Sequence, residues 1–259
     1  MYGRVLIIAG SDSGGGAGIQ GDIKTVTALG SYAATAITAL TAQNTLGVFG
    51  IHEVPDDFIA QQIELVLSDI GADAIKTGML HRVGVIKTVA KSLEKFKEVP
   101  LIIDPVMVAK GGAALLEPEA VESLKHLLVP HAFLVTPNVP EAEILAEIKI
   151  SDVDGMIAAA EKIMKLGSVN VLVKGGHLDS DKIYNVLAWQ GGVKVFETRR
   201  RQTRNTHGTG CALSSAIATF IAQKYPLGKA VKKALNYVDA AIKNAPNIGS
   251  GHGPLNHMV

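Results

Sequence analysis

The fold is decided by Val5-Leu6-Ile7-Ile8-Ala9 and the segment that follows it, Gly10-Ser11-Asp12-Ser13-Gly14-Gly15-Gly16-Ala17-Gly18. A short run that has no polar residue and is rich in β-branched side chains predicts a strand buried on both faces of a sheet. The glycine-rich segment predicts a loop, and residues 19–29 then show helical spacing. A strand, a glycine loop and a helix in this order are typical of a ligand-binding turn at the carboxyl edge of an α/β sheet.

Strand-like and helical segments alternate along the rest of the chain. The predicted strands, some with their exit loops, occupy residues 34–41, 72–80, 100–106, 133–138, 169–177, 184–189 and 193–197. The predicted helices occupy residues 55–69, 83–96, 118–128, 152–166, 211–224 and 227–243, and another begins at Val139. Gln190-Gly191-Gly192 is the one clear hairpin signal and predicts an antiparallel edge. The sequence has no linker and no repeat, so we expect one domain over residues 1–259, a three-layer α/β/α sandwich with a mostly parallel central sheet.

Composition narrows the classes of partner and compartment. Of the 259 residues, 47% are hydrophobic, which is ample for a packed core, and the net charge of +1 gives no electrostatic reason to expect nucleic acid or a membrane surface as a partner. The first residues lack the layout of a signal peptide, and no apolar run is long enough to span a bilayer. The single cysteine cannot form an intramolecular disulfide, so we expect a cytoplasmic protein.

A second glycine loop, Asn205-Thr206-His207-Gly208-Thr209-Gly210-Cys211, leads into the apolar helix expected from residue 211. Unpaired amides and the dipole at a helix start favour a phosphate or a developing oxyanion, and glycine lets the backbone approach such a ligand closely. Cys211 stands at this helix start, so we expect its pKa to be lowered. An ordinary loop before a buried helix with a core cysteine is the alternative, because short glycine motifs often match by chance.

Polar and glycine signals follow the predicted strands instead of lying along the helices. Besides the two glycine loops, they are Gln43, Met79, Asp104, Asn138 and Lys174. Because the carboxyl ends of parallel strands share one edge of a sheet, these groups should converge. Amides, a lysine and acidic residues suit a magnesium nucleotide, since Mg²⁺ takes a few carboxylates together with phosphate oxygens and water. The G-x-x-x-x-G-K-[ST] run of P-loop enzymes is absent.

Several of these signals also have plainer interpretations. The amide of Gln43 can both donate to and accept from a heterocycle edge, but a Gln-Asn pair more often lies in a turn with its amides in solvent. Met79 can line a pocket or fill a gap in the core. His207 is either a phosphate contact or a loop histidine held by its neighbours, and we favour the latter. A Rossmann dinucleotide site is the rival for the first loop, yet no following strand ends in an acidic residue at the spacing that a ribose needs.

Seven motifs, taken in order, resemble the hydroxymethylpyrimidine/phosphomethylpyrimidine kinases of thiamine biosynthesis, a family of the ribokinase-like superfamily. Two of them are Lys76-Thr77-Gly78-Met79-Leu80 and the loop at 205–211, and the others occupy residues 9–20, 38–45, 104–107, 136–141 and 173–177. The resemblance extends from Gly10 to the tail at 251–254, so it covers nearly the whole chain.

The resemblance implies an ATP-dependent kinase with a ribokinase-like fold and with ATP and Mg²⁺ as cofactors. Its substrates would be 4-amino-5-hydroxymethyl-2-methylpyrimidine and then the monophosphate, which becomes the diphosphate. The family tends to form homodimers, so we expect a homodimer whose other partners are small molecules. The alternative within the superfamily is a pyridoxal or pyridoxine kinase. A pyrimidine sensor without turnover and a dinucleotide oxidoreductase are alternatives from other classes.

The resemblance also implies a role for each matching residue. The anion hole would comprise Gly208, Thr209 and Gly210, and Cys211 would be a proton acceptor where sugar kinases of the superfamily carry an aspartate. The pyrimidine pocket would be lined by Gln43, Gly10, Asp22, Met79 and Val106. The residues assigned to ATP are Lys174, Asn138 and Thr206, and those assigned to the metal are Asp104 and Glu141.

Overall fold

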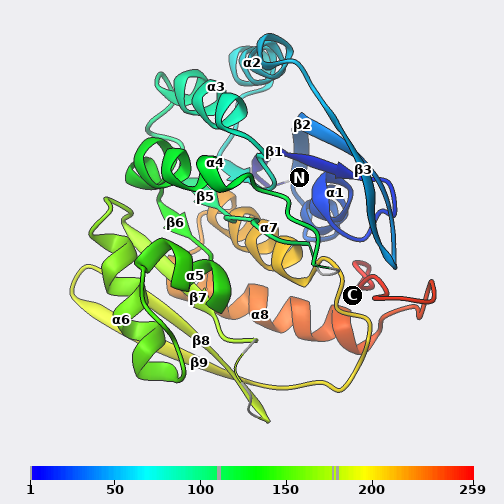
Figure 1. Cartoon of the computed structure of the whole chain (residues 1–259), viewed down its shortest axis with the longest axis vertical. Coiled ribbons are helices and arrows are strands. Elements are labelled where there is room, and N and C mark those ends of the chain that lie inside the picture. Colours follow the sequence, from blue (N-terminus) through cyan, green and yellow to red (C-terminus); the bar gives the residue numbers. More distant parts are fainter. Residues whose placement is uncertain (1, 110–111, 177, 179–180) are drawn as a thin grey trace.

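The computed structural model describes residues 2–109, 112–176, 178 and 181–259, and in this part of the chain nine strands form one sheet in the order β3-β2-β1-β4-β5-β6-β7-β8-β9 (Figure 1). The strands are β1 (Arg4–Asp12), β2 (Tyr32–Asn44), β3 (Gly47–Glu53), β4 (Ala74–Thr77), β5 (Leu101–Ile103), β6 (Leu134–Val135), β7 (Asn170–Lys174), β8 (Lys182–Trp189) and β9 (Gly192–Arg199). The six central strands, in the sheet order β2-β1-β4-β5-β6-β7, pair in parallel. The mostly parallel sheet that the sequence predicts is therefore confirmed.

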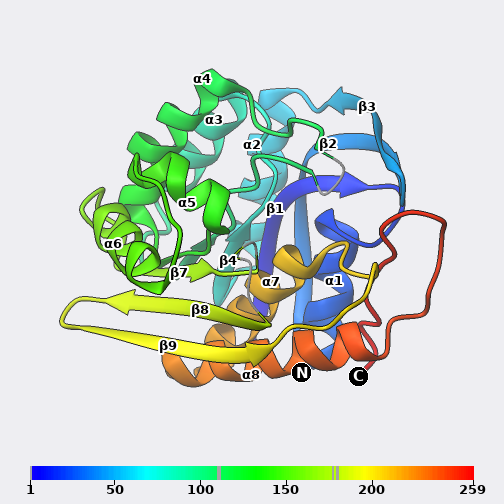
Figure 2. The same cartoon turned by 60° about the horizontal axis from the view of Figure 1, so that its bottom comes forward.

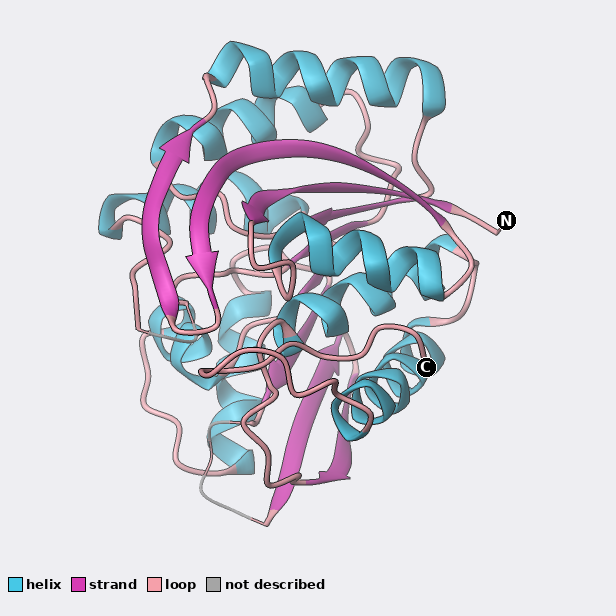
Figure 3. Cartoon of the chain, turned by 90° about the vertical axis from the view of Figure 1, so that its right-hand side faces the viewer, coloured by secondary structure: helices cyan, strands magenta, loops and turns pink. Residues whose placement is uncertain are grey.

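Both edges of the sheet are antiparallel, although the sequence predicted only one. The β8–β9 hairpin confirms the prediction from Gln190-Gly191-Gly192. The second antiparallel pair, β2 with β3, was missed. Its turn is Thr45-Leu46, which lacks the glycine dipeptide of a favoured two-residue turn, and β3 itself contains Gly47 and Gly50. Figure 3 shows the bent β2–β3 pair on the side that faces the viewer.

Helices cover both faces of the sheet (Figure 2). One face packs against α1 (Gly18–Ala28), α7 (Thr209–Ala222) and α8 (Leu227–Lys243), and the other against α2 (Asp56–Leu65), α3 (Val83–Leu93), α4 (Pro118–Ser123), α5 (Val139–Ala146) and α6 (Val153–Met164). Alternate residues of a strand point to opposite faces, and β1 follows this rule: Leu6 and Ile8 join one core, whereas Val5 and Ile7 join the other. The expected three-layer sandwich is confirmed.

The ends of three helices differ from the prediction. The helices expected over 55–69 and 118–128 each end in a π-helical turn, at Val66–Ile70 and Leu124–Leu128. A five-residue turn hardly disturbs the spacing of apolar residues, so the sequence pattern does not reveal it. Helix α7 begins at Thr209, two residues before the expected Cys211. Among the described residues, no helix is both long and apolar enough to cross a bilayer.

The carboxyl ends of the parallel strands lie along one edge of the sheet, as expected. Asp12 ends β1, Asp104 follows β5 directly, and Lys174 ends β7. The C-terminal segment crosses this edge: the N–H of His207 donates to the carbonyl of Gly253 at 3.1 Å. The N–H of His252 donates to the carbonyl of Thr45 at 2.9 Å. The tail thus connects the turn after β2 to the loop before α7.

His257 anchors the tail in the core beside α1 and α8. It is 5% exposed, its Nδ1 lies 3.1 Å from Thr25 Oγ1, and its carbonyl accepts from the Tyr237 hydroxyl at 3.0 Å. The Thr25 hydroxyl donates to the carbonyl of Gly21 at 2.8 Å, so the proton shared with His257 belongs to Nδ1. Burial, together with the charge of Lys24, lowers the pKa of His257 to about 4.

Folding should therefore weaken as the pH falls through the range between the unfolded and folded pKa values of His257. The unfolded chain binds the proton below about pH 6.5 and the folded chain only below about 4, so stability is present above this window and is lost on descending through it. We expect the free energy of unfolding, measured with urea, to fall by about 1–2 kcal/mol between pH 7 and pH 5 on account of His257. His257→Asn keeps a donor near Nδ1 and does not titrate, so it should remove that part of the slope.

The same substitution at the exposed His52 controls for the general loss of an imidazole. An equal pH dependence in the wild type and in His257→Asn would contradict the prediction.

Candidate active site

The loop before α7 is fitted against the first glycine loop by backbone contact. Gly208, the N-cap of α7, has φ +81°, and a Cβ atom added to it would collide with the carbonyl oxygen of Gly16. No other residue satisfies both conditions, so glycine is required here. The first turn of α7, with the amides of Gly210 and Cys211, is thereby held at the carboxyl edge of the sheet. Amides of a first turn have no partner within the helix and can bind an anion.

An ion pair lies beside this first turn. Lys174 Nζ donates to Asp104 Oδ1 at 2.8 Å, and Ser214 of α7 donates to Asp104 Oδ2 at 3.3 Å. A Cβ atom added to Gly210 would lie 3.3 Å from Lys174 Nζ and 3.9 Å from Asp104 Oδ2. The structure therefore brings together three of the predicted residues, from β7, from the end of β5 and from α7.

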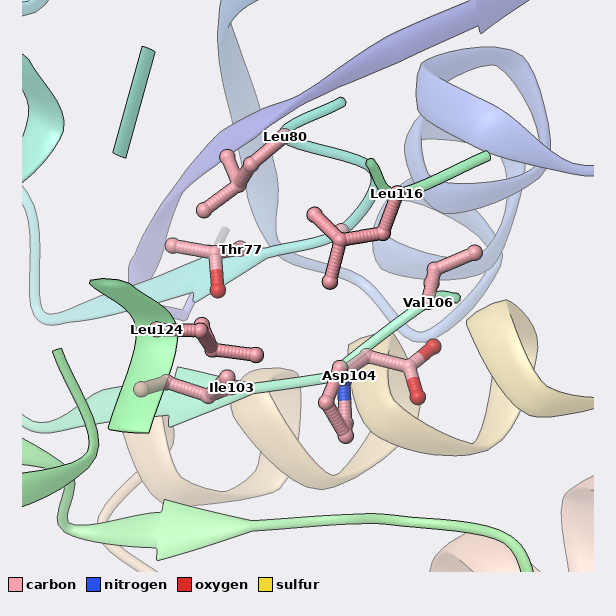
Figure 4. A pocket seen from close by; sticks show the side chains of 9 residues that line it. Thr77, Leu80, Ile103, Asp104, Val106, Leu116 and Leu124 are labelled. Carbon is pink, nitrogen blue, oxygen red and sulfur yellow. The ribbon is translucent and has the colours of Figure 1, made fainter. Parts of the chain in front are cut away.

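The pocket in Figure 4 lies on the side of β5 opposite to Lys174 and α7. Asp104 contributes to its lining, but most of the lining is apolar. In Figure 4 the carboxylate of Asp104 points toward α7 and away from the side chains of Leu80 and Leu124. The carboxylate of Asp104 thus faces Lys174 and α7, and the apolar pocket, which Val106 also lines, borders the candidate site.

The two members of this ion pair and the nearby Glu141 shift one another's pKa values, and Lys76 contributes as well. Burial alone would raise the pKa of Asp104, but Lys174 and Lys76 outweigh it and lower the pKa. Burial alone would lower the pKa of Lys174, but Asp104 and Glu141 raise it. Burial raises the pKa of Glu141 to about 7, and repulsion by Asp104 adds to the rise while Lys174 opposes it. Asp104 and Lys174 are therefore charged at neutral pH, and Glu141 is balanced between its two states.

Asn138 and Glu141 form a capping box at the start of α5. The Asn138 side chain accepts from the Glu141 N–H at 2.9 Å, and Glu141 Oε2 accepts from the Asn138 N–H at 2.8 Å. Both residues are thus tied to the helix start by their backbones. The resemblance assigned Asn138 to ATP and Glu141 to the metal. The Glu141 carboxylate also accepts a backbone hydrogen bond from Met107, so a metal would use the lone pairs that these two backbone bonds leave.

The carboxylates of Asp104 and Glu141 fit a magnesium ion that phosphates help to hold. The two groups repel each other, which a divalent cation would relieve. Among the described residues, no group of three or more His, Cys, Asp or Glu side chains could hold a metal. Mg²⁺ usually keeps several waters and takes one or two carboxylates plus substrate phosphates, so two acidic residues suffice.

The expectation that Cys211 has a lowered pKa is wrong. Burial raises the pKa of the thiol to about 12; Lys76 and a hydrogen bond from the Gly18 N–H lower it, whereas Asp22 and Asp104 raise it further. Cys211 is the third residue of α7, and the loss of solvent there outweighs the effect of the helix start. The thiol is therefore neutral at rest.

A second cluster lies at the end of β2. Gln43 Oε1 lies 3.1 Å from the Thr41 hydroxyl, and Gln43 Nε2 lies 3.4 Å from His207 Nε2. His207 Nε2 donates to Asp12 Oδ2 at 2.7 Å. Gln43 and His207 both line a small pocket next to the turn after β2. His207 is thus a loop histidine held by its neighbours, as favoured from the sequence, and it stands between Gln43 and the first turn of α7.

Three other residues assigned to the pyrimidine pocket pack together under this cluster. A Cβ atom added to Gly10 would lie 3.0 Å from Met79 Sδ, so the two residues are in contact. Met79 is 7% exposed and packs in a small apolar cluster that includes Val106. Their position beside β1 and β4 is compatible with the base of a pocket, and it equally satisfies the core role that the sequence left open for Met79.

Asp22 lies deeper than the sequence led us to expect. It is 0% exposed, and its carboxylate accepts from Lys76 Nζ at 2.7 Å and from Ser215 Oγ at 2.7 Å. Lys76 belongs to one of the seven sequence motifs, but the sequence alone did not predict a role for it. A lysine inside the apolar strand Ala74–Thr77 needs a buried partner of opposite charge, and this signal could have found the pair.

Thr206 and Thr209 serve the start of α7. The carbonyl of Thr206 accepts from the N–H of Thr209 at 3.3 Å and from its hydroxyl at 2.8 Å. The Thr209 hydroxyl is therefore directed back to the loop, and the backbone is what this segment offers to an anion. His177, at the end of the motif at 173–177, lies outside the described residues.

Comparisons with known proteins agree with this geometry. The family model described as phosphomethylpyrimidine kinase matches residues 12–256. The thiamine biosynthesis bifunctional protein ThiED of Geobacter sulfurreducens is 51% identical over 99% of this chain, which spans 52% of that protein. The hydroxymethylpyrimidine/phosphomethylpyrimidine kinase of Bacillus subtilis is 46% identical, with 99% of this chain and 95% of that protein covered.

A solved structure leads to the same superfamily. An ADP complex of Bacillus subtilis pyridoxal kinase superposes with a TM-score of 0.92 at 36% identity, covering 99% of this chain and 98% of that one. Fold, motifs and sequence identity over nearly the full length thus agree. The chain belongs to the phosphomethylpyrimidine kinase family of phosphotransferases.

Proposed function

We propose that the protein transfers the γ-phosphoryl group of ATP to 4-amino-5-hydroxymethyl-2-methylpyrimidine and then phosphorylates the monophosphate to the diphosphate, in thiamine biosynthesis. The observation that carries this proposal is the meeting of the first turn of α7 with the Lys174–Asp104 ion pair. Amides and a lysine at one point can stabilise the charge of a phosphoryl group in transfer. The 46% identity to a kinase named for these substrates supports the choice of acceptor.

The reaction assigns work to each part of the site. The amides of Gly208 and Gly210 face the oxygens of the moving phosphoryl group, and Lys174 neutralises charge next to them. Thr209 holds the turn between these two amides, because its own N–H donates to the Thr206 carbonyl. Asn138 and Thr206 border the nucleotide phosphates. Cys211 is a thiol at rest and first loses its proton to water; the thiolate then accepts the proton of the acceptor hydroxyl as that oxygen attacks phosphorus.

Asp104 and Glu141 would hold the magnesium ion. When bound, Mg²⁺ supplies positive charge that neutralises the phosphate oxygens. The pKa of Glu141, about 7, makes its carboxylate sensitive to protonation in the neutral range. Protonated Glu141 is a poor magnesium ligand, so metal affinity should decline as the pH falls below about 7.

The pyrimidine is proposed to bind beside Gln43 and His207, above Gly10, Met79 and Val106, with its hydroxymethyl group directed to the first turn of α7. The Gln43 amide can donate to a ring nitrogen and accept from the exocyclic amine. Asp22 acts from below this pocket through Lys76 and Ser215, since none of its surface is exposed.

A pyridoxal kinase is the second candidate, and one observation favours it. The similarity to the Bacillus subtilis pyridoxal kinase reaches a TM-score of 0.92, so the two backbones can frame the same pocket. A substituted pyridine and a substituted pyrimidine differ mainly in the groups along the ring edge. The two functions are therefore separated by the substrate that the protein turns over.

The test is incubation of the purified protein with ATP, Mg²⁺ and the pyrimidine alcohol, followed by mass analysis. We expect the monophosphate to appear first and the diphosphate later. A parallel incubation with pyridoxal tests the second candidate. Binding of the pyrimidine without any product would indicate a sensor, and binding of NAD in place of ATP would indicate an oxidoreductase; either result would refute the proposal.

Gln43→Ala should weaken pyrimidine binding and spare ATP. Loss of the amide leaves a polar ring edge unpaired, so we expect the KM for the pyrimidine to rise by about 10- to 100-fold and the KM for ATP to change by less than about twofold. Gln61→Ala, at an exposed position of α2, is the matched control. Equal losses for the two substrates would show that Gln43 does not read the pyrimidine.

We also propose that the chain acts as a single domain and forms a homodimer in the cytoplasm. The single sheet supports one domain, and the lone cysteine suits a reducing compartment. The edge strand β3 carries Phe49, which is 71% exposed, and Leu46 in the adjacent turn is 61% exposed. An exposed apolar edge suits pairing with a second copy.

Sedimentation should find a wild-type dimer, and Phe49→Glu should shift the protein toward the monomer. Lys194→Glu, at an exposed position of the opposite edge strand β9, controls for the added charge. A monomeric wild type would refute the dimer, and a dimeric Phe49→Glu would refute this interface.

A further inference from the structure

Lys76 is fully buried beneath the candidate site. It lies in β4, its side chain is 0% exposed, and its Nζ donates to Asp22 Oδ2 at 2.7 Å. Asp22 is equally buried, and its other oxygen accepts from Ser215 Oγ at 2.7 Å. A buried ion pair usually adds little stability relative to apolar residues of the same volume, so its presence calls for another reason.

The ammonium group lies against the backbone at the end of β4. A Cβ atom added to Gly78 would lie 3.0 Å from Lys76 Nζ, so the group sits directly under the backbone that leads to Met79. Ser215, which fixes Asp22, is one helical turn beyond Cys211 in α7. The pair Lys76–Asp22 is thus connected from below to the helix that carries the thiol.

Charged groups reach the thiol of Cys211 from four elements. Lys76 acts on it from β4, Asp22 from α1, Asp104 from the end of β5 and Lys174 from β7. Burial raises the pKa of the thiol to about 12, and Lys76 is the largest influence in the opposite direction. Burial alone would lower the pKa of Lys76, but Asp22 outweighs it, so Lys76 stays charged throughout the neutral range.

We propose that Lys76 is a positioning residue for phosphoryl transfer: its ammonium group, held in place by Asp22, stabilises the thiolate form of Cys211. This inference rests on the proposed role of Cys211 as proton acceptor. The thiolate takes the proton of the acceptor hydroxyl, so an S–H bond forms and an O–H bond breaks. The hydroxyl oxygen bonds to the γ-phosphorus while the bond to ADP breaks, and ADP leaves with the electron pair. The thiol then returns its proton to water.

The chain contains one cysteine, so any thiol signal comes from Cys211. The experiment is alkylation of the full-length protein with iodoacetamide between pH 7 and pH 10, without substrate or nucleotide. Only the thiolate reacts, so the rate at a fixed pH follows the thiolate fraction. Lys76→Met should slow alkylation by about tenfold or more, which corresponds to a rise of at least one unit in the pKa of Cys211.

Asp22→Asn removes the counter-charge that keeps the buried Lys76 protonated, and Lys76 acts on the thiol more strongly than Asp22 does. We therefore expect alkylation of Asp22→Asn to be slower than that of the wild type, because a neutral Lys76 no longer stabilises the thiolate. Ser215→Ala removes a hydrogen bond to Asp22 without removing a charge, so it is the matched control and should stay within about twofold. Loosened packing would accelerate alkylation in all three variants, so slower alkylation in Lys76→Met and in Asp22→Asn separates electrostatics from a structural role.

A double variant covers the case in which Lys76→Met alone does not fold. Lys76→Met combined with Asp22→Asn leaves no unpaired buried charge. It should react more slowly than the wild type by about the factor expected for Lys76→Met, because both variants lack the ammonium charge. An unchanged or faster rate for a folded variant that lacks Lys76 would overturn the inference.

Kinase assays supply the second arm. Lys76→Met should lower kcat by about tenfold, with a change of less than about threefold in the KM for ATP. In a Cys211→Ala background the same substitution should have no further effect, and an equal loss in both backgrounds would overturn the inference. If the protein turns over no pyrimidine, the proposed function fails, whereas the alkylation result stands by itself.

Discussion

The contact between Gly208 and the carbonyl of Gly16 is the constraint on which the rest of the site depends. Two loops that lie almost 200 residues apart approach so closely that neither a side chain nor a different backbone conformation fits. This contact sets the height of α7 above the sheet. The height of α7 in turn decides that Gly210 lies beside Lys174 and that Ser214 reaches Asp104.

Around this contact the protein buries charges in compensating pairs. Lys174 faces Asp104, and Lys76 faces Asp22. Each pair links a strand end to another element, so the electrostatics also fix the geometry. Burial raises the pKa of Glu141 toward neutrality, because Lys174 opposes the loss of solvent only in part. A nucleotide with a divalent cation would enter a site whose charges are already held in position, so little reorganisation would accompany the reaction.

Much of the fold could be predicted because it depends on local patterns. The apolar run at 5–9 and the alternation that follows it identify a parallel sheet with helices on both faces. The β3 edge could not be found, since its glycines and exposed positions give no alternation, and the π-helical turns leave the apolar spacing intact. Cys211 was placed correctly at the start of α7, but its pKa was not, because desolvation depends on neighbours far away in the sequence. Lys76 and Asp22 pair across 54 positions, and only the folded chain selects that partner.

The C-terminal tail restricts how a ligand can enter the small pocket. Residues 252 and 253 are bonded to the turn after β2 and to the loop before α7, so they bridge the two sides of the small pocket between Gln43 and His207. To open this pocket further, either those two hydrogen bonds must break or the C-terminal tail must move together with the turn. Access to this pocket is therefore coupled to movement of the C-terminal tail. His257 is buried, so it limits how far the tail can move.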